Sequence, residues 1–175
     1  MDRRAEFEAM HADLGPAVRT FVHRRIDPAV ADDVVAEVFL AAWRRFDKAP
    51  SDVLPWLLGI ARGVLANQRR GDGRRAALHR RLADHAPSGE PASEALSGDS
   101  AVLRALTSLS PRDQETLLLI AWDGLDRRQA ARVLGMSTGQ LAVRLHRARR
   151  RLQGALDEEQ RQPRPLRPAK TPEVL

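Results

Sequence analysis

Apolar residues recur at helical spacing along most of this chain, and that periodicity restricts the fold more than any other feature of the sequence. Three such stretches fall between about residues 3 and 82, and further ones follow between residues 101 and 156. No stretch shows the sustained alternation of apolar and polar residues that marks a half-buried strand. The sequence therefore predicts an all-α protein.

A segment of linker composition divides this helical pattern in two. Residues 85–100, HAPSGEPASEALSGDS, are rich in Pro, Gly, Ser and acid, which is typical of a connecting segment. We therefore expect two helical domains joined by a flexible linker: an N-terminal helical bundle over residues 1–84 and a helix-turn-helix domain over residues 101–156. Residues 157–175 contain four prolines and no core-forming pattern, and they are predicted to be a disordered tail.

Composition excludes several classes of function. The chain of 175 residues has no cysteine, which rules out zinc ribbons and thiol chemistry. Its histidines show no ligand spacing with acids, and no acids converge with a nucleophile and its base. We expect no metal, no other cofactor and no enzymatic activity. The sequence contains no signal-peptide core and no run of about 20 apolar residues, which predicts a cytoplasmic protein with no membrane partner.

The charge of the chain favours a polyanionic partner. Its net charge is +6, as expected for a protein that binds nucleic acid, an acidic membrane surface or an acidic protein. Of the 29 basic residues only Lys48 and Lys170 are lysines, a skew that a GC-rich genome produces without functional meaning. The positions of the arginines are therefore more informative than their number.

Residues 125–152 hold eight arginines and one acid around regularly spaced leucines. Asp126 is a plausible cap for a short helix, Gly135 supplies a turn, and Ser137 can cap a second helix. In that second helix one stripe is apolar and the stripe one residue earlier is polar and mostly cationic. The apolar stripe contains Leu141, Leu145, Ala148 and Leu152, and the cationic stripe contains Gln140, Arg144, Arg147 and Arg151. This pattern predicts a helix-turn-helix.

The second of these helices has side chains suited to the DNA major groove, where Arg pairs with guanine and Gln with adenine. We expect the residues near its start, Thr138, Gln140 and Arg144, to read bases. The later arginines, at positions 147, 149, 150 and 151, are expected to contact phosphates, with Arg147, Arg150 and Arg151 as the main candidates. A solvated basic face on an ordinary helical hairpin remains the alternative.

The N-terminal domain has a different pattern. In DDVVAEVFLAAWRRF, a broad apolar face includes Phe39, while Asp33 and Glu37 stand one turn apart on another side. These acids are suited to a basic partner, or they merely favour a helix start and contact water. The next helix has Pro55 near its first turn, and residues 57–85 contain seven arginines against two acids, a second cationic surface. Trp43, Trp56 and Trp122 are most simply core residues.

Three segments, in this order and spacing, resemble a known family. They are ADDVVAEVFLAAWRRF, PWLLGIARGVLANQRR and LTSLSPRDQETLLLIAWDGLDRRQAARVLGMSTGQLAVRLHRARRRL. They are similar to the extracytoplasmic-function sigma factors of bacterial RNA polymerase, and the resemblance covers about residues 5–156. It implies a promoter-recognition subunit whose partners are core RNA polymerase and promoter DNA.

The resemblance also implies roles for individual residues. The helix from Asp32 to Arg45 would dock on a coiled coil of the largest polymerase subunit, with the polymerase-binding candidates Asp32, Asp33, Glu37, Phe39 and Leu40. The segment from Phe46 to Arg70 would recognise and open the minus-ten element, with the DNA-binding candidates Lys48, Arg62, Arg69 and Arg70. The helix-turn-helix would read the minus-thirty-five element as duplex, and Arg127 and Arg128 would lie near the DNA backbone.

Some residues depart from the pattern of this family. Relatives often carry Thr, Lys and Ser where this chain has Gln140, Ala142 and Val143. The promoter sequence is therefore expected to differ from the family's commonest one. Many relatives are held inactive by an anti-sigma factor, which makes such an inhibitor a candidate partner. The alternative function is a free-standing helix-turn-helix transcription regulator, which would bind a palindromic duplex as a dimer.

Overall fold

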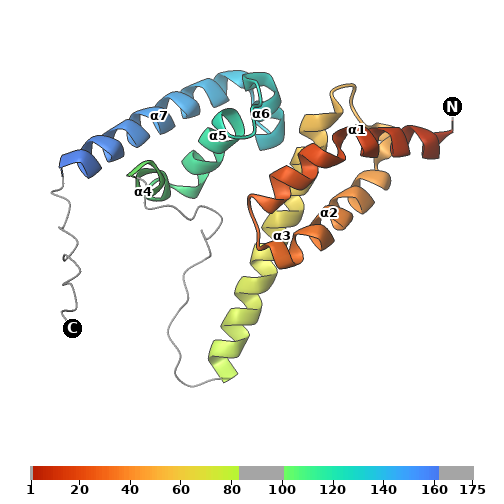
Figure 1. Ribbon diagram of the computed structural model, residues 1–175, viewed down its shortest axis with the longest axis horizontal. Coiled ribbons are helices and arrows are strands. Elements are labelled where there is room, and N and C mark those ends of the chain that lie inside the picture. Colours follow the sequence, from red (N-terminus) through yellow and green to blue (C-terminus); the bar gives the residue numbers. More distant parts are fainter. Residues whose placement is uncertain (1, 83–100, 162–175) are drawn as a thin grey trace, which may run out of the picture.

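The structure is a computed structural model that describes residues 2–82 and 101–161 (Figure 1). The first unit contains α1 (Arg3–His23), α2 (Pro28–Trp43), the short 3-10 turn η1 (Phe46–Lys48) and α3 (Val53–Leu82). The second unit contains α4 (Ala101–Thr107), α5 (Pro111–Ala121), α6 (Arg127–Leu134) and α7 (Thr138–Arg161). These ranges contain no strand, so the predicted all-α fold is confirmed.

The start of the predicted tail differs from expectation, and two predicted segments fall outside these ranges. Residues 157–161 are the last turn of α7, so this part of the predicted tail is helical. The predicted linker, residues 85–100, and the rest of the predicted tail, residues 162–175, lie outside the described residues.

Local capping explains where the helices of the first unit begin. The Asp2 carboxylate accepts a hydrogen bond from the backbone N–H of Arg4, and Asp27 caps α2 in the same way through Ala29, with Pro28 at the first helical position. α1 runs through Gly15 and Pro16 without a break, although a Gly-Pro pair usually interrupts a helix. Val18, Phe21 and Val22 lie just after this proline and are buried, and their packing outweighs its helix-breaking tendency.

The helix-turn-helix forms where the sequence predicts it. Asp126 and Gln129 form a reciprocal capping box at the start of α6. Gly135 ends α6 in the left-handed region at φ 65°, a conformation that a side chain would strain. Leu141, Leu145 and Ala148 of α7 are buried, as the stripe predicts.

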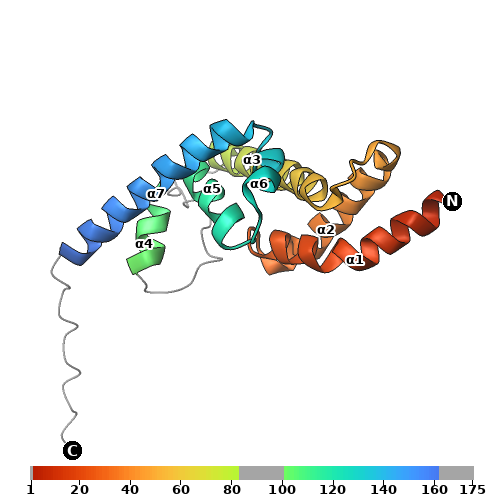
Figure 2. The same ribbon diagram turned by 90° about the horizontal axis from the view of Figure 1, so that it is seen from above.

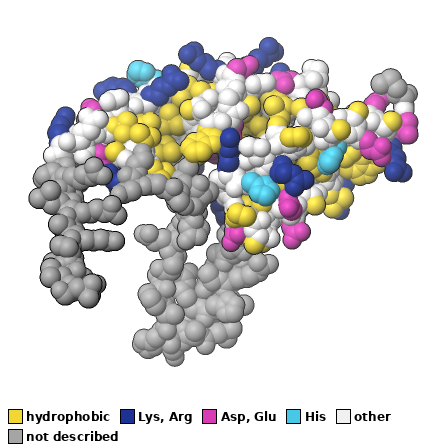
Figure 3. All heavy atoms as spheres, in the orientation of Figure 1, with side chains coloured by type: hydrophobic (Ala, Val, Ile, Leu, Met, Phe, Trp, Pro, Cys, Tyr) yellow, Lys and Arg dark blue, Asp and Glu magenta, His cyan; other side chains and the backbone are white. Residues whose placement is uncertain are grey.

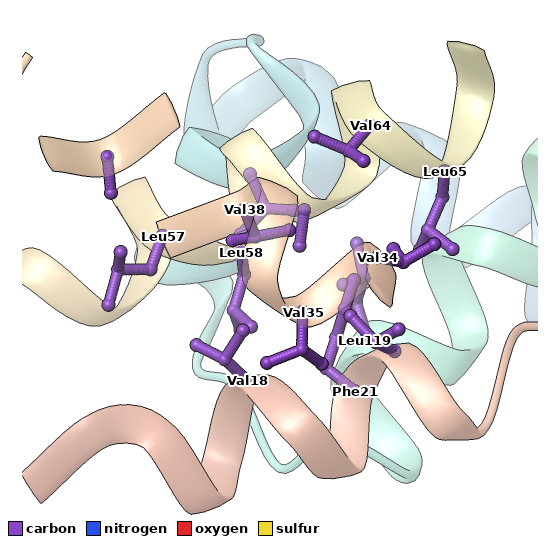
Figure 4. Packing of buried hydrophobic residues seen from close by; sticks show 14 of the residues in the cluster. Val18, Phe21, Val34, Val35, Val38, Leu57, Leu58, Val64, Leu65 and Leu119 are labelled. Atoms are coloured by element: carbon purple, nitrogen blue, oxygen red, sulfur yellow. The ribbon is translucent and has the colours of Figure 1, made fainter. Parts of the chain in front are cut away.

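The two units share one hydrophobic core. It combines residues of α1, α2 and α3 with Leu119 of α5, Leu125 of the loop before α6, Ala130, Ala131 and Val133 of α6, and Leu141 of α7. Figure 4 shows Leu119 next to Phe21 and Val34 of the first unit. Figure 2 shows α6 over α3, with α7 leading away from the first unit. A second cluster, which includes Leu106, Leu117 and Leu145, holds α4, α5 and α7 together.

Candidate nucleic-acid and polymerase interfaces

The exposed face of α7 is the first candidate surface. One turn of an α-helix takes 3.6 residues, so Val143 lies about 200° around the axis from buried Leu141. Arg147 and Arg150 are exposed on the same outer side, and Gln140 is exposed near the helix start. In Figure 3 Lys and Arg side chains line the upper rim of the molecule, above α6 and α7. The outer face of α7 is therefore cationic, with one exposed apolar side chain.

Gln140 has a structural role in addition to its predicted role in reading bases. Its side-chain oxygen accepts a hydrogen bond from the backbone N–H of Ser137 at 3.0 Å, while the Ser137 hydroxyl accepts from the N–H of Gln140 at 3.2 Å. This pair is a capping box, so Ser137 caps α7 as the sequence predicts. Bidentate pairing of Gln140 with adenine would require its side-chain oxygen to leave this cap.

Arg151 is tied to a buried acid. Its Nη1 donates to Oδ2 of Asp113 at 2.5 Å, and the Ser110 hydroxyl donates to the same oxygen at 2.9 Å. Burial by itself raises the pKa of Asp113, but the hydrogen bonds from Arg151 and Ser110 and the charges of Arg151 and Arg144 outweigh it and lower the pKa below its ordinary value. Arg151 therefore joins α7 to α5, a role that the sequence did not reveal.

Replacement of Asp113 by Asn is expected to lower stability at neutral pH but not in acid. A carboxyl whose pKa is lowered on folding stabilises the fold above its unfolded pKa of about 4, and this contribution disappears as the pH falls through the folded pKa. Hydrogen bonds to a charged group of this kind contribute about 1.5–3 kcal/mol. Urea unfolding at pH 7 should show a loss of this order for Asp113→Asn, and the difference from wild type should shrink towards pH 3. The exposed Asp13→Asn should show no such pattern; a difference for Asp113→Asn that is independent of pH would contradict the assignment.

The DNA-binding candidates of the first unit do not form one free surface. Lys48 is exposed at η1. Arg62 pairs with Glu115 of α5 (Nε to Oε1 2.6 Å), Arg69 donates to the backbone oxygen of Arg25 at 3.2 Å, and Arg70 donates to Asn67. The remaining arginines of the predicted cationic surface, at positions 74, 75, 80 and 81, have side chains outside the described part of the chain.

Polar contacts accompany the shared core between the two units. The loop after α5 carries Asp123, whose side chain is only 5% exposed and forms an ion pair with Arg25. Arg24 donates to the backbone oxygen of Trp122 at 3.0 Å, and its guanidinium lies over the Trp122 ring. At the other side of the interface Arg132 of α6 donates to Asp52 at 2.9 Å. Three acids at positions 52, 115 and 123 thus pair with arginines of the opposite unit.

The outer face of α2 is the second candidate surface. Asp33, Glu37 and Leu40 follow each other at helical spacing and are exposed, Leu40 to 51%. Asp32 is also exposed, but its carboxylate pairs with Arg19 and contacts His23. Phe39 is only 7% exposed and contacts the rings of Phe7 and His11, so its assignment to the polymerase-binding face is wrong. Its place on the broad apolar face of α2 is confirmed.

The tryptophans lie in different environments. Trp56 packs against the shared core, and Trp43 contacts Phe7 and carries the Arg3 guanidinium on its ring. Trp122 is 48% exposed, so its assignment to the core is wrong. It is the C-cap residue of α5 and lies two positions before Gly124, which has φ 68°. The Asp123–Gly124 turn signal could have placed Trp122 at the end of the helix, next to a loop.

The described residues contain neither a metal-binding cluster nor a membrane-spanning helix. In residues 2–82 and 101–161 no group of three or more His, Asp or Glu side chains is arranged to hold a metal ion. No helix in the same ranges has the length and apolarity needed to cross a membrane.

Comparisons with known proteins identify the family. Residues 10–75 match the family model of sigma-70 region 2, and residues 99–152 match that of sigma-70 region 4. These two regions correspond to the two helical units. The chain belongs to the sigma-70 family of RNA polymerase sigma factors, and within it to the extracytoplasmic-function group.

Several sigma factors align with most of the length of this chain. It is 35% identical over 133 residues to the probable RNA polymerase sigma factor RfaY of Xanthomonas campestris pv. campestris, over 70% of this chain but only 33% of RfaY. It is 28% identical to the RNA polymerase sigma factor NccH of Alcaligenes xylosoxydans xylosoxydans, over 84% of this chain and 82% of NccH. The ECF RNA polymerase sigma factor BldN of Streptomyces coelicolor is also 28% identical, over 89% of this chain and 62% of BldN.

Solved structures of the family have the same architecture. The sigma factor RpoE in complex with the anti-sigma factor NepR, from Bartonella quintana, matches with a TM-score of 0.63 and 27% identity, over 87% of this chain and 97% of RpoE. The structure of CnrH in complex with the cytosolic domain of CnrY matches with a TM-score of 0.60 and 26% identity, over 89% and 90% of the two chains.

Proposed function

We propose that this chain directs core RNA polymerase to specific promoters and promotes DNA melting when transcription begins. The observation that carries this proposal is the cationic outer face of α7, which lies opposite a buried stripe in the second helix of a helix-turn-helix. The same chain presents exposed acids on α2, a surface that nucleic acid would repel and a basic protein would attract. A protein with both surfaces is suited to bridge DNA and polymerase.

The helix-turn-helix unit is assigned to the minus-thirty-five element. Thr138, Gln140 and Arg144 lie in the first turns of α7, from which side chains reach base edges in the major groove. Arg127 and Arg128 are exposed at the start of α6, and Arg147 and Arg150 are exposed further along α7. These four arginines are assigned to phosphates, which fix the position of the protein without reading sequence.

The first unit is assigned to the minus-ten element and to polymerase. Lys48, Arg69 and Arg70 supply positive charge for the displaced strand, and Arg62 joins them once Glu115 releases it. Asp33, Glu37 and Leu40 form the polymerase-docking face of α2, with Asp32 at its edge.

Binding to both elements requires the two units to separate. The minus-ten and minus-thirty-five elements are centred about 25 base pairs apart, which is roughly 85 Å along B-DNA. In this structure the units share a core, so one arrangement cannot place both on their elements. The connecting residues 83–100 can span at most about 60 Å when extended, which permits a large separation. Promoter binding is therefore linked to loss of the contacts made by Asp123 and Glu115.

An inhibitor that stabilises the joined arrangement would oppose this separation. The Bartonella RpoE structure contains an anti-sigma factor, and a protein of that class is a candidate partner for this chain as well. The chain would act in the cytoplasm, where polymerase and promoter DNA are found, and it would not itself be a catalyst.

Binding to polymerase is the direct test of the proposed function. The purified chain and purified core polymerase are passed through a size-exclusion column together and separately. Co-elution in a one-to-one complex is the expected result. Specific binding to a palindromic duplex by the chain alone, with no polymerase complex, would instead indicate the free-standing regulator. The match to both sigma-70 regions favours the polymerase subunit.

Arg144 and Arg150 are expected to differ in their effect on promoter choice. A bidentate contact from Arg144 to guanine contributes about 1–3 kcal/mol of discrimination, so Arg144→Ala should reduce binding to a matched promoter and relax selectivity at one base pair. Arg150→Ala should weaken binding to all promoters similarly and reduce the salt dependence. Holoenzyme affinities on matched and single-mismatch promoters at several salt concentrations check this. If Arg144→Ala weakened holoenzyme binding to all promoters equally, the base-reading role of Arg144 would be wrong.

A further inference from the structure

Val143 is an apolar side chain at the centre of the cationic face of α7. Leu141, Leu145 and Ala148 turn into the core, and Val143 projects almost directly opposite to them. Its side chain is 53% exposed. No part of the fold that is described covers it. Valine also has a lower helix propensity than alanine. Its presence at this position is therefore not explained by folding.

The neighbours of Val143 form a shallow depression on the surface. Together with Val143 it is lined by Gly139, Gln140, Arg144, Arg147, Asp113 and Arg151. The space beside Gly139 is open, since a Cβ added there would come only within 4.0 Å of the Ser137 hydroxyl. Asp113 is already paired with Arg151 and Ser110. The methyl groups of Val143 are therefore accessible from outside, between one amide and two cationic side chains.

An exposed valine among cationic side chains indicates one kind of partner. Exposed Arg147 and Arg150 on the same face favour an anionic ligand. An apolar protein surface would require a larger apolar patch than one valine. Duplex DNA combines phosphates with an apolar group in its major groove, the C5 methyl of thymine.

We propose that Val143 determines specificity for a thymine at one base pair of the duplex element that α7 reads, through contact with the C5 methyl group. This inference rests on the proposed function, because it requires α7 to enter the major groove of a promoter. Gln140 and Arg144 flank Val143 along the helix and would address the neighbouring base pairs. Burial of one methyl group corresponds to about a fourfold change in affinity.

Deoxyuridine tests this contact because it differs from thymidine only by the missing methyl group. Promoters are first selected from a randomised library by the holoenzyme formed from the full chain and its core polymerase. Each thymine of the upstream element is then replaced singly by deoxyuridine, and affinity is measured for wild type and for Val143→Ala. We expect a loss of about fourfold at one position for wild type. Val143→Ala should show a similar loss on the thymine template and no further loss with deoxyuridine at that position.

Arg150→Ala is the matched control. It removes a side chain from the same face but should preserve the wild-type difference between thymine and deoxyuridine. The inference is overturned if no deoxyuridine substitution distinguishes wild type from Val143→Ala, or if the selected element contains no thymine. A holoenzyme that selects no promoter at all would overturn the proposed function as well, so the two failures are distinguishable.

Discussion

The double charge reversal Asp33→Arg with Glu37→Arg is expected to abolish stable binding to core polymerase while leaving the free protein folded. Both side chains are exposed one turn apart on α2. Like charges brought together at an interface cost several kcal/mol, which corresponds to a loss of affinity of at least about a hundredfold. Neither residue belongs to the hydrophobic core, so helix content and urea stability should stay near wild type. Affinity for core polymerase, measured with a fluorescently labelled chain, checks the expectation.

The control for this experiment reverses two exposed acids elsewhere. Glu6→Arg with Asp13→Arg changes the net charge by the same amount on α1. This control should retain most of the polymerase affinity. Equal losses of polymerase affinity in both variants would indicate a general charge effect. An unchanged affinity in the α2 variant would place the docking face elsewhere.

The variant Asp123→Ala is expected to destabilise the joined arrangement of the two units more than any other single change at their polar contacts. Its carboxylate is buried and paired with Arg25, whose side chain is only 13% exposed. Removal of one partner leaves a buried charge without compensation, which costs about 3–5 kcal/mol. Urea unfolding should show this loss, and small-angle scattering should show a larger radius of gyration at unchanged helix content.

Asp52→Ala provides a matched comparison at the same interface. It breaks the pair with Arg132, in which both side chains are more than a third exposed. Pairs of this kind contribute about 0–1 kcal/mol, so the scattering curve should stay close to that of wild type. Similar behaviour of the Asp52 and Asp123 variants would mean that the loop after α5 does not hold the units together.

The helix-turn-helix could be predicted in detail because its determinants are local. The capping residue Asp126, the left-handed Gly135, the capping residue Ser137 and the buried stripe of α7 all act within a few residues. Helical periodicity also predicted the apolar face of α2. The same periodicity could not exclude Phe39 from the docking face, because only the packing of α1 against α2 shows which apolar residues are covered.

The contacts between the units were beyond prediction from the sequence. Arg25 and Asp123 are 98 positions apart, and Arg62 and Glu115 are 53 apart. A single sequence does not indicate which arginine of a basic chain pairs with which acid. Arg151 illustrates the consequence, since its position on the cationic stripe suggested a phosphate contact, whereas its nearest partner is Asp113 on α5. Pro16 is a related case, because tertiary packing keeps α1 continuous across a residue that usually breaks helices.

Start-site mapping in a purified transcription reaction tests the central claim most directly. Core polymerase is incubated with a library of promoter fragments, with and without the full chain, and the 5′ ends of the transcripts are sequenced. We predict that the chain produces defined start sites that share two sequence elements at a fixed spacing, and that Asp33→Arg with Glu37→Arg removes them. Transcripts with the same start sites in the presence and absence of the chain would contradict the account.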